Sequence, residues 1–272
     1  MSGGHGTPIA LTIAGSDSSG GAGIQADLKT FTALGVYGAS AITAITAQNT
    51  MGVQGVLTLP ADIIAAQMAS IAADLAVGAI KTGMLADRTT VETVAGGLAA
   101  FAGLPLVVDP VMVATSGDVL LAPAAVDAVR TQLFPRATVV TPNLGEAARL
   151  LECPRASSLD EMEAQGRRLL ALGPGAVLMK GGHDVGTDAT DILVLPSGSL
   201  RFARPRIATR NTHGTGCTLA AAIAARLARG DTLASAVGAA KDFVWNAIQA
   251  GQELGVGKGN GPVDHLHAIR RP

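Results

Sequence analysis

The sequence predicts an α/β fold of three layers, in which helices cover both faces of a mostly parallel central sheet. Short β-branched runs alternate along the chain with longer stretches of helical periodicity, which is the pattern of βαβ units. Apolar residues make up 48% of the sequence, enough to fill the core of such a sandwich. No low-complexity linker or abrupt change of composition interrupts the alternation, so we expect a single domain over residues 1–272.

The strands and helices are expected in the following order along the chain. Strands are predicted at residues 9–14, 40–47, 79–81, 106–109, 138–141 and 176–180. The first helix carries apolar residues three or four positions apart on one face, namely Ile24, Leu28, Phe31 and Leu34. Further helices are predicted at residues 61–73, 90–102, 124–133, 158–172, 218–229 and 233–250. The apolar runs 192–195 and 200–203 flank a Pro-Ser-Gly-Ser turn and predict an antiparallel hairpin at one sheet edge.

Composition and charge exclude several classes of function. The formal net charge is −1 and aromatic residues make up 3%, so the chain lacks the cationic field and the stacking platforms that hold nucleic acids. Two cysteines, Cys153 and Cys217, are too few for a disulfide scaffold or a four-ligand zinc site. The most apolar stretch, residues 95–108, is too short to span a membrane, and residues 1–8 are too polar for a signal peptide. We therefore expect a cytoplasmic protein without nucleic-acid or membrane partners, and its charge-poor composition favours a homodimer.

Polar clusters follow five of the predicted strands. They lie at residues 15–23, 48–49, 109–110, 141–146 and 180–183. In open, mostly parallel sheets, ligands bind at the edge formed by the carboxyl ends of the strands. The convergence of these clusters on one edge therefore predicts a ligand site there.

A glycine-rich segment, residues 211–217 (Asn-Thr-His-Gly-Thr-Gly-Cys), runs directly into a predicted helix. Glycines at a helix start let consecutive backbone N–H groups point at one place, where the helix dipole also favours an anion. The segment favours a phosphate-binding cradle over a merely tight turn, which would account for one glycine rather than two flanking Thr215.

Cys217 stands at the N-terminal end of the same helix, where the dipole is expected to lower the pKa of its thiol. This position favours a role as a base or as a positioning group, whereas Cys153 is interpreted as an inert residue. A Cys–His hydrolase with His213 as the base is a competing interpretation. The separation of only four positions argues against it, because such enzymes bring together residues that are distant in sequence.

Two nucleotide-binding patterns are present only in part. Residues 21–26 match the dinucleotide fingerprint G-x-G-x-x-A after a strand, but the second strand ends without the acidic residue that binds a ribose. Residues 257–259 (Gly-Lys-Gly) lack the Ser or Thr and the earlier glycine of a P-loop. These departures argue against a dinucleotide-dependent oxidoreductase, so any nucleotide site is of another kind.

Polar residues after three of the later strands are candidates for metal and phosphate binding. Asn143 and Glu146 lie three residues apart at a predicted helix start, on one face, where they are placed to hold a hydrated Mg²⁺. Helix capping explains the same pair without a metal. Lys180 precedes two glycines and faces either a ligand phosphate or solvent, and Asp109 either orients a metal-bound water or starts a turn.

With these motifs together, the sequence resembles the hydroxymethylpyrimidine/phosphomethylpyrimidine kinases of thiamine biosynthesis, in the ribokinase-like superfamily. The resemblance extends over nearly the whole chain, through residues 10–29, 46–50, 81–84, 108–112, 116–118, 141–143, 179–183, 211–217 and 257–265. It implies a ribokinase-like three-layer fold. The pyridoxal kinases share that fold and the Gly-Thr-Gly loop, so phosphorylation of pyridoxal is the alternative.

The resemblance also implies a role for each matching position. A catalytic group would comprise Cys217, Gly214 and Gly216, with Cys217 standing where related sugar kinases carry an Asp base. The pyrimidine would be bound by Gln48, Asp27, Gly15, Met84 and Val111, with the Gln48 amide pairing to the nitrogen edge of the ring. ATP would be held by Lys180, Asn143, Thr215 and His213, and Mg²⁺ would be organised by Glu146 and Asp109 together with Asn143.

The implied reaction is transfer of the γ-phosphoryl group of ATP to the hydroxymethyl oxygen of 4-amino-5-hydroxymethyl-2-methylpyrimidine, and then to the monophosphate so formed. Phosphoryl transfer has a loose transition state, so in-line positioning and charge neutralisation supply most of the acceleration and a strong base is not required. A pyrimidine sensor that binds without turnover is a further alternative, but it would leave the phosphate cradle without a purpose.

Overall fold

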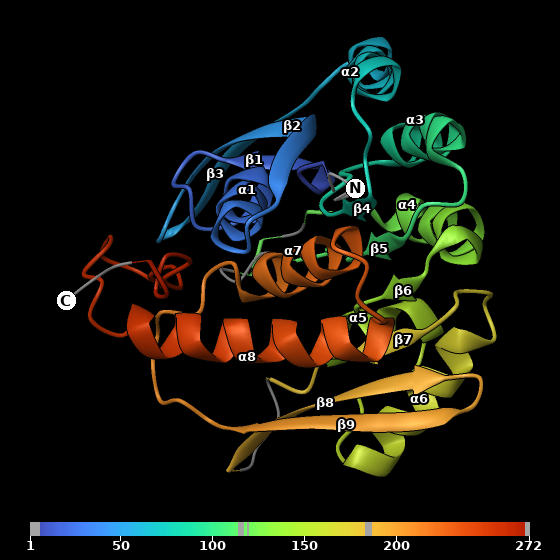
Figure 1. Ribbon diagram of the computed structural model, residues 1–272. Coiled ribbons are helices and arrows are strands. Elements are labelled where there is room, and N and C mark those ends of the chain that lie inside the picture. The colour runs from blue at the N-terminus through green and yellow to red at the C-terminus, as the bar shows by residue number, and fades with distance from the viewer. Residues whose placement is uncertain (1–5, 114–116, 119, 183–186, 270–272) are drawn as a thin grey trace, which may run out of the picture.

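The computed structural model describes residues 6–113, 117–118, 120–182 and 187–269. Within them one sheet of nine strands has the order β3-β2-β1-β4-β5-β6-β7-β8-β9, and helices pack on both of its faces (Figure 1). The expected three-layer α/β/α sandwich with a mostly parallel sheet is therefore confirmed. In the part of the chain that is described, no helix is both long and apolar enough to cross a membrane.

The centre of the sheet consists of parallel strands, and its two edges are antiparallel. The parallel strands are β1 (Ile9–Asp17), β2 (Tyr37–Asn49), β4 (Ala79–Thr82), β5 (Leu106–Val108), β6 (Val139–Val140) and β7 (Val177–Met179). The predicted hairpin forms one edge as β8 (Asp188–Leu195) and β9 (Gly198–Pro205). The other edge is β3 (Gly52–Thr58), an antiparallel strand that the sequence patterns did not predict.

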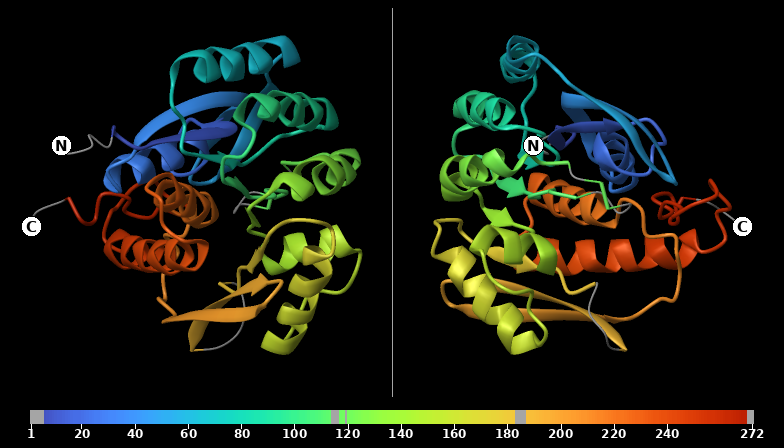
Figure 2. Two further views of the ribbon diagram at one scale, coloured as in Figure 1. Left: turned by 45° about the vertical axis from the view of Figure 1, so that its right-hand side comes forward. Right: turned by 180° about the vertical axis from the view of Figure 1, so that it is seen from behind.

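The helices form two layers. α1 (Gly23–Ala33), α7 (Thr215–Ala228) and α8 (Leu233–Gly251) cover one face of the sheet. The other face carries α2 (Ala61–Asp74), α3 (Arg88–Gly97), α4 (Pro123–Ala128), α5 (Leu144–Leu151) and α6 (Leu159–Leu170). A 3-10 turn, Leu98–Phe101, extends α3. A π-helical segment, Val129–Leu133, and a 3-10 turn, Phe134–Arg136, extend α4. The two views of Figure 2 show the helix layers on opposite sides of the sheet.

Two apolar clusters, one under each helix layer, make up the core. Neighbouring strand residues point to opposite faces, so Val107 packs toward α7 and α8 while Val108 packs toward the layer that contains α3 and α4. Ala10 and Leu11 on β1 divide in the same way. Because β1, β4, β5, β6 and β7 are buried on both faces, they read in the sequence as short continuous apolar runs, whereas burial alternates along much of β2.

The elements that matter for function meet at one edge of the sheet. The chain leaves β1, β4, β5, β6 and β7 at their carboxyl ends there, and α1, α5 and α7 begin nearby. The first turns of these three helices therefore offer backbone N–H groups at the edge where the loops converge.

Candidate active site

A cavity of about 720 Å³ opens at this edge of the sheet. Its volume lies in the range of small-molecule and cofactor sites. The residues that were expected to bind ligands and that line this cavity are Gly15, Gln48, Met84, Asp109, Val111, Asn143, Glu146, Lys180, His213, Gly214, Thr215, Gly216 and Cys217. His183 of the fifth polar cluster and Ser116 of the 116–118 motif lie outside the described residues.

Asp27 is the expected ligand residue that the structure places elsewhere. Its side chain is fully buried beneath the cavity rather than in its wall. One carboxylate oxygen, Oδ2, accepts from the hydroxyl of Thr12 over 2.6 Å and pairs with Nζ of Lys81 over 2.8 Å. Lys81 does line the cavity, so the expectation that Asp27 contacts a ligand is wrong and its influence passes through that lysine.

The segment 213–217 forms the expected cradle at the start of α7. Gly214 is the N-cap of this helix, with φ of +80°, and a Cβ atom there would collide with the carbonyl oxygen of Gly21. The N–H groups of Gly216 and Cys217 lie in the first turn, where no intrahelical acceptor exists. A Cβ atom on Gly216 would stand 3.4 Å from Nζ of Lys180. The cradle therefore faces a cation across a gap kept open by a glycine, an arrangement suited to an anionic group.

Cys217 lines the cavity beside this cradle, but its thiol does not have the expected low pKa. Burial raises the pKa of Cys217 to about 11, and neither the positive charge of Lys81 nor a hydrogen bond from the backbone N–H of Gly23 offsets that effect. The expectation that the helix dipole lowers this pKa is therefore wrong. The side chain is a protonated thiol at neutral pH, and it stands where the first turns of α1 and α7 meet.

A lysine and two carboxylates occupy the floor of the cavity between β5, α5 and β7. Nζ of Lys180 lies 2.8 Å from Oδ1 of Asp109 and 3.9 Å from Oε2 of Glu146. The hydroxyl of Thr141 donates to the same Oδ1 over 2.9 Å. Burial and the negative charge of Asp109 raise the pKa of Glu146 to about 7, against the opposing effect of Lys180. The two acids therefore share the positive charge of Lys180.

Asn143 and Glu146 also form the capping box that opens α5. The Asn143 side chain accepts from the N–H of Glu146 over 2.9 Å, and the Glu146 carboxylate accepts from the N–H of Asn143 over 2.7 Å. Asp109 uses Oδ1 in its contacts with Thr141 and Lys180, and the Glu146 carboxylate also accepts from the backbone N–H of Met112. Oxygen donors of this kind suit Mg²⁺. Among the described residues no three His, Cys, Asp or Glu side chains are grouped to enclose a metal. Mg²⁺ is commonly held by one or two carboxylates together with waters and substrate phosphates, and the pair Asp109 and Glu146 fits that pattern.

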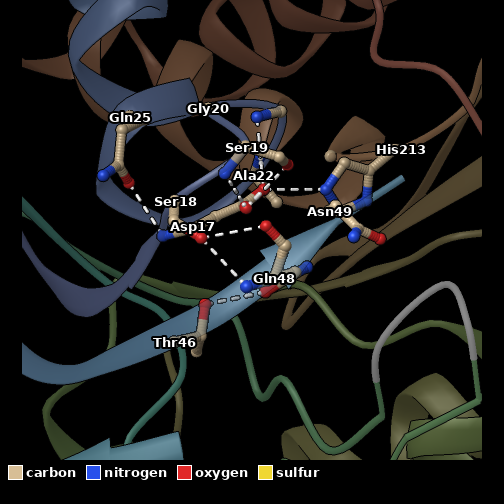
Figure 3. Close-up of polar contacts among 12 residues, drawn as sticks. Asp17, Ser18, Ser19, Gly20, Ala22, Gln25, Thr46, Gln48, Asn49 and His213 are labelled. Atoms are coloured by element: carbon tan, nitrogen blue, oxygen red, sulfur yellow. Dashed lines mark hydrogen bonds and ion pairs between the residues drawn. The ribbon is translucent and has the colours of Figure 1, made fainter. Parts of the chain in front are cut away.

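Asp17, the last residue of β1, contacts His213 of the cradle (Figure 3). Nε2 of His213 lies 2.8 Å from Oδ2 of Asp17. Burial raises the pKa of this carboxyl, but the hydrogen bonds from His213, Ser19 and Ala22 outweigh burial and hold the pKa well below its usual range. The pair therefore carries a fixed negative charge at Asp17. Because this contact occupies Nε2, His213 keeps only Nδ1 for a nucleotide.

The opposite wall of the cavity is narrow and partly apolar. Gly15 lies at the end of β1, and a Cβ atom there would stand 3.0 Å from Sδ of Met84. The carbonyl of Met84 accepts from the buried hydroxyl of Thr43 over 2.7 Å, which fixes the loop after β4. Val111 and Gln48 complete this wall, which has the width and polarity for a small heterocycle.

The far end of the cavity was missed at the level of the sequence. Lys241 of α8 pairs with Asp191 of β8 over 2.7 Å, and Asp191 also accepts from the N–H of Gly181 over 3.0 Å. Beside this pair, Trp245 donates through its indole N–H to the carbonyl of Pro205 over 2.8 Å. Two signals could have identified this end: a lysine in an Ala-rich helix and the one tryptophan of the sequence.

Comparison with known proteins adds independent observations. Residues 17–264 match the model of the phosphomethylpyrimidine kinase family. A hydroxymethylpyrimidine/phosphomethylpyrimidine kinase of Rhizobium meliloti (strain 1021) is 56% identical over 261 residues, which cover 96% of this chain and 98% of the relative. One of the same description from Escherichia coli (strain K12) is 52% identical over 259 residues, covering 95% and 97%.

Among solved structures, Bacillus subtilis pyridoxal kinase in its ADP complex is similar to this chain. The TM-score is 0.89 at 39% sequence identity, and the match covers 97% of this chain and all of that one (100%). The two proteins therefore share their fold over almost their full length, and that relative was determined with a nucleotide bound.

Proposed function

The chain belongs to the phosphomethylpyrimidine kinase family, and from that premise we propose how its cavity carries out the family's reaction. Its activity is the ATP-dependent phosphorylation of 4-amino-5-hydroxymethyl-2-methylpyrimidine to the monophosphate and then to the diphosphate, two steps of thiamine diphosphate biosynthesis. The observation that carries the proposal is that a phosphate cradle and a narrow heterocycle wall face each other across one cavity.

The donor nucleotide occupies the half of the cavity between α7 and α8. Its phosphates are bound by the N–H groups of Gly216 and Cys217 and by Lys180, whose ammonium lies against the cradle. The adenine base lies at the apolar end beside Trp245 and Ile248. Support comes from the length of the cavity, which runs continuously from this end to the floor, and from the ADP bound to the Bacillus subtilis relative.

The floor carboxylates would hold Mg²⁺, because Asp109 and Glu146 offer oxygen donors beside the cradle and share the ammonium of Lys180. When bound, the cation would neutralise charge on the transferring phosphoryl group. Lys180 keeps Asp109 oriented by the contact at 2.8 Å and contributes a positive charge of its own. Asn143 positions Glu146 through the capping box.

The acceptor heterocycle lies against Gly15, Met84 and Val111, with its polar edge toward Gln48. This position aims the hydroxymethyl oxygen at the cradle. In the first transfer the proton of the alcohol leaves late and passes to an oxygen of the transferred phosphoryl group, while Cys217, a protonated thiol, lines the cavity as a positioning group. In the second transfer the attacking phosphate is already anionic and needs no base, so one site serves both steps.

Phosphorylation of pyridoxal is the second candidate, favoured by the TM-score of 0.89 to a pyridoxal kinase. One experiment tests both candidates. Purified protein is incubated with ATP and Mg²⁺ and with either the pyrimidine alcohol or pyridoxal, while ADP release and phosphorylated products are measured. We expect both pyrimidine phosphates to form in sequence. Absence of ADP release with either alcohol would remove the kinase assignment.

A homodimer is part of the proposal. Ile45 of β2 and Leu57 of β3 are partners in the strand register, and they are 47% and 65% exposed. A second copy of the chain would cover this apolar edge of the sheet. Sedimentation equilibrium should give twice the mass of the chain, and Leu57→Glu should reduce it to the monomer.

We also propose a cytoplasmic location. The phosphoryl donor, ATP, is available there, and Cys217 is a free thiol in the cavity. Cell fractionation followed by immunodetection should find the protein with cytoplasmic markers rather than with the membrane or the culture medium.

A further inference from the structure

Gln48 stands at the end of β2, and most of its polar groups already have partners (Figure 3). Its backbone N–H donates to Oγ of Ser18 over 2.9 Å, and the Ser18 hydroxyl donates to the Gln48 carbonyl oxygen, also over 2.9 Å. Its side-chain Oε1 accepts from the hydroxyl of Thr46 over 3.0 Å. Among the described contacts, the side-chain Nε2 is the polar group that is left for a ligand.

Thr46 is held more firmly than the glutamine that it contacts. Its side chain is 3% exposed, and its hydroxyl lies 2.8 Å from the carbonyl oxygen of Ser16 on β1. The hydroxyl hydrogen is therefore shared between two acceptors, one on the neighbouring strand and one on Gln48. This anchors the acceptor end of the Gln48 amide to the central part of the sheet.

An amide side chain has an acceptor end and a donor end, and a half-turn about its last bond exchanges them. With Oε1 held beside Thr46, the Gln48 amide turns its donor end, Nε2, toward a ligand and keeps its acceptor end at the strand. An aminopyrimidine offers both kinds of partner, since a ring nitrogen accepts and an exocyclic amino group donates. A fixed amide discriminates between these partners, whereas one that rotates freely would accept either.

We propose that Thr46 is a positioning residue that determines substrate specificity: it fixes the Gln48 amide so that only a heterocycle presenting an unprotonated ring nitrogen is bound well. The proposal rests on the proposed function, because it takes Gln48 as the contact to the heterocycle. It adds a selection rule that Gln48 alone would not supply. Thr46 also lines the cavity, but its hydroxyl is engaged by Ser16 and Gln48, so its removal should change which ring atoms the enzyme recognises through Gln48.

The test combines Thr46→Val with changes to the substrate. Valine keeps the shape of threonine and removes the hydroxyl. Steady-state kinetics are measured with the pyrimidine alcohol and with two deaza analogues, in each of which one ring nitrogen is replaced by C–H. In the unchanged protein, one analogue should lose about tenfold in kcat/KM, the magnitude of one hydrogen bond. In Thr46→Val the same replacement should cost less than about threefold, which is the signature of a released amide.

The kinetic constants should separate as well. We expect Thr46→Val to raise KM for the pyrimidine alcohol roughly five- to tenfold, with kcat and KM for ATP within about twofold. Thr46→Ser keeps the hydroxyl and should restore the original values. Thr30→Val is the matched control, because Thr30 is a fully buried threonine of α1 whose hydroxyl donates to Ala26 within its own helix. It should leave all constants and the analogue preference unchanged.

Several outcomes would overturn the proposal. An unchanged KM in Thr46→Val, or an equal cost of the ring-nitrogen replacement in both proteins, would show that the amide is not held by this contact. If Thr46→Val does not fold, titration calorimetry of the unchanged protein decides: equal affinity for the parent alcohol and both analogues would mean that no ring nitrogen is recognised. Failure of the proposed function looks different, because the unchanged protein would then not turn over the pyrimidine alcohol at all.

Discussion

Substitution of Gly216 by alanine separates the binding role of the cradle from its folding role. An added Cβ atom would lie 3.4 Å from Nζ of Lys180 and 3.8 Å from Oδ2 of Asp109, which is ordinary van der Waals contact. The fold therefore accommodates the methyl group, and alanine in a first helical turn gains up to about 1 kcal/mol over glycine. The methyl group nevertheless fills the gap in which we place a phosphate. Loss of two charge-assisted hydrogen bonds there costs about 3 kcal/mol, or roughly 100-fold.

The assay is kcat/KM for ATP together with thermal unfolding of the same preparation. We expect Gly216→Ala to lose roughly 100-fold in kcat/KM while its Tm is unchanged or slightly higher. Gly96→Ala in α3 is the matched control, because nothing lies within 4 Å of the added Cβ atom and it is remote from the cavity. Gly214→Ala should instead lose stability, since φ is +80° and the added atom meets the Gly21 carbonyl. An unchanged kcat/KM in Gly216→Ala would refute the placement of the phosphate.

Three further predictions concern Cys217, His265 and the buried Lys81–Asp27 pair. Cys217→Ala should slow the first phosphorylation more than the second, because the thiol positions the neutral alcohol, whereas the monophosphate carries its own anionic nucleophile; equal losses in the two steps, followed by product analysis, would show that the cysteine only shapes the cradle. Burial lowers the pKa of His265 to about 4, below its unfolded value near 6.5, so the unfolded chain binds a proton first as the pH falls. The free energy of unfolding should therefore drop by about 2–3 kcal/mol between pH 6.5 and pH 4, and urea titrations of His265→Asn should show a shallower dependence. Lys81→Met should cost about 3–5 kcal/mol of stability by leaving the fully buried Asp27 carboxylate unpaired, and the added change Asp27→Leu should recover part of that loss in the same titration.

The part of the site that could be predicted from the sequence is the part built by consecutive residues. The cradle is one such segment, since Gly214 and Gly216 stand beside Cys217 at a helix start and local geometry alone aims their N–H groups. The ends of the parallel strands are also local features. Asp109 and Lys180 follow buried runs, so the rule that such ends share one edge of a sheet predicted that they would meet.

The properties that depend on long-range packing could not be predicted in this way. Asp27 pairs with a lysine 54 positions away, and no spacing in the sequence reveals that contact or the burial that goes with it. The pKa of Cys217 depends on the same burial, which outweighs the helix dipole that is visible in the sequence. The edge strand β3 was not predicted because most of it is exposed. Its apolar residues Val56 and Leu57 are consecutive, so the segment lacks the alternation of apolar and polar residues that indicates a half-buried strand.

The rigidity of the two halves of the cavity bears on how one site serves two transfers. The donor half is built from the start of α7 and from residues such as Asp109 that directly follow strands, so the cradle cannot shift when the acceptor gains a phosphate. The ring must then lie farther from the cradle in the second step than in the first. The acceptor wall allows this, because Met84 is an unbranched and adaptable side chain and Gly15 leaves room beside its sulfur. Gln48, held on the sheet by Thr46, keeps hold of the nitrogen edge only if the ring pivots about that hydrogen bond. Such a pivot explains why the Gln48 amide is fixed at the end of a strand while the neighbouring Met84 side chain can change its conformation.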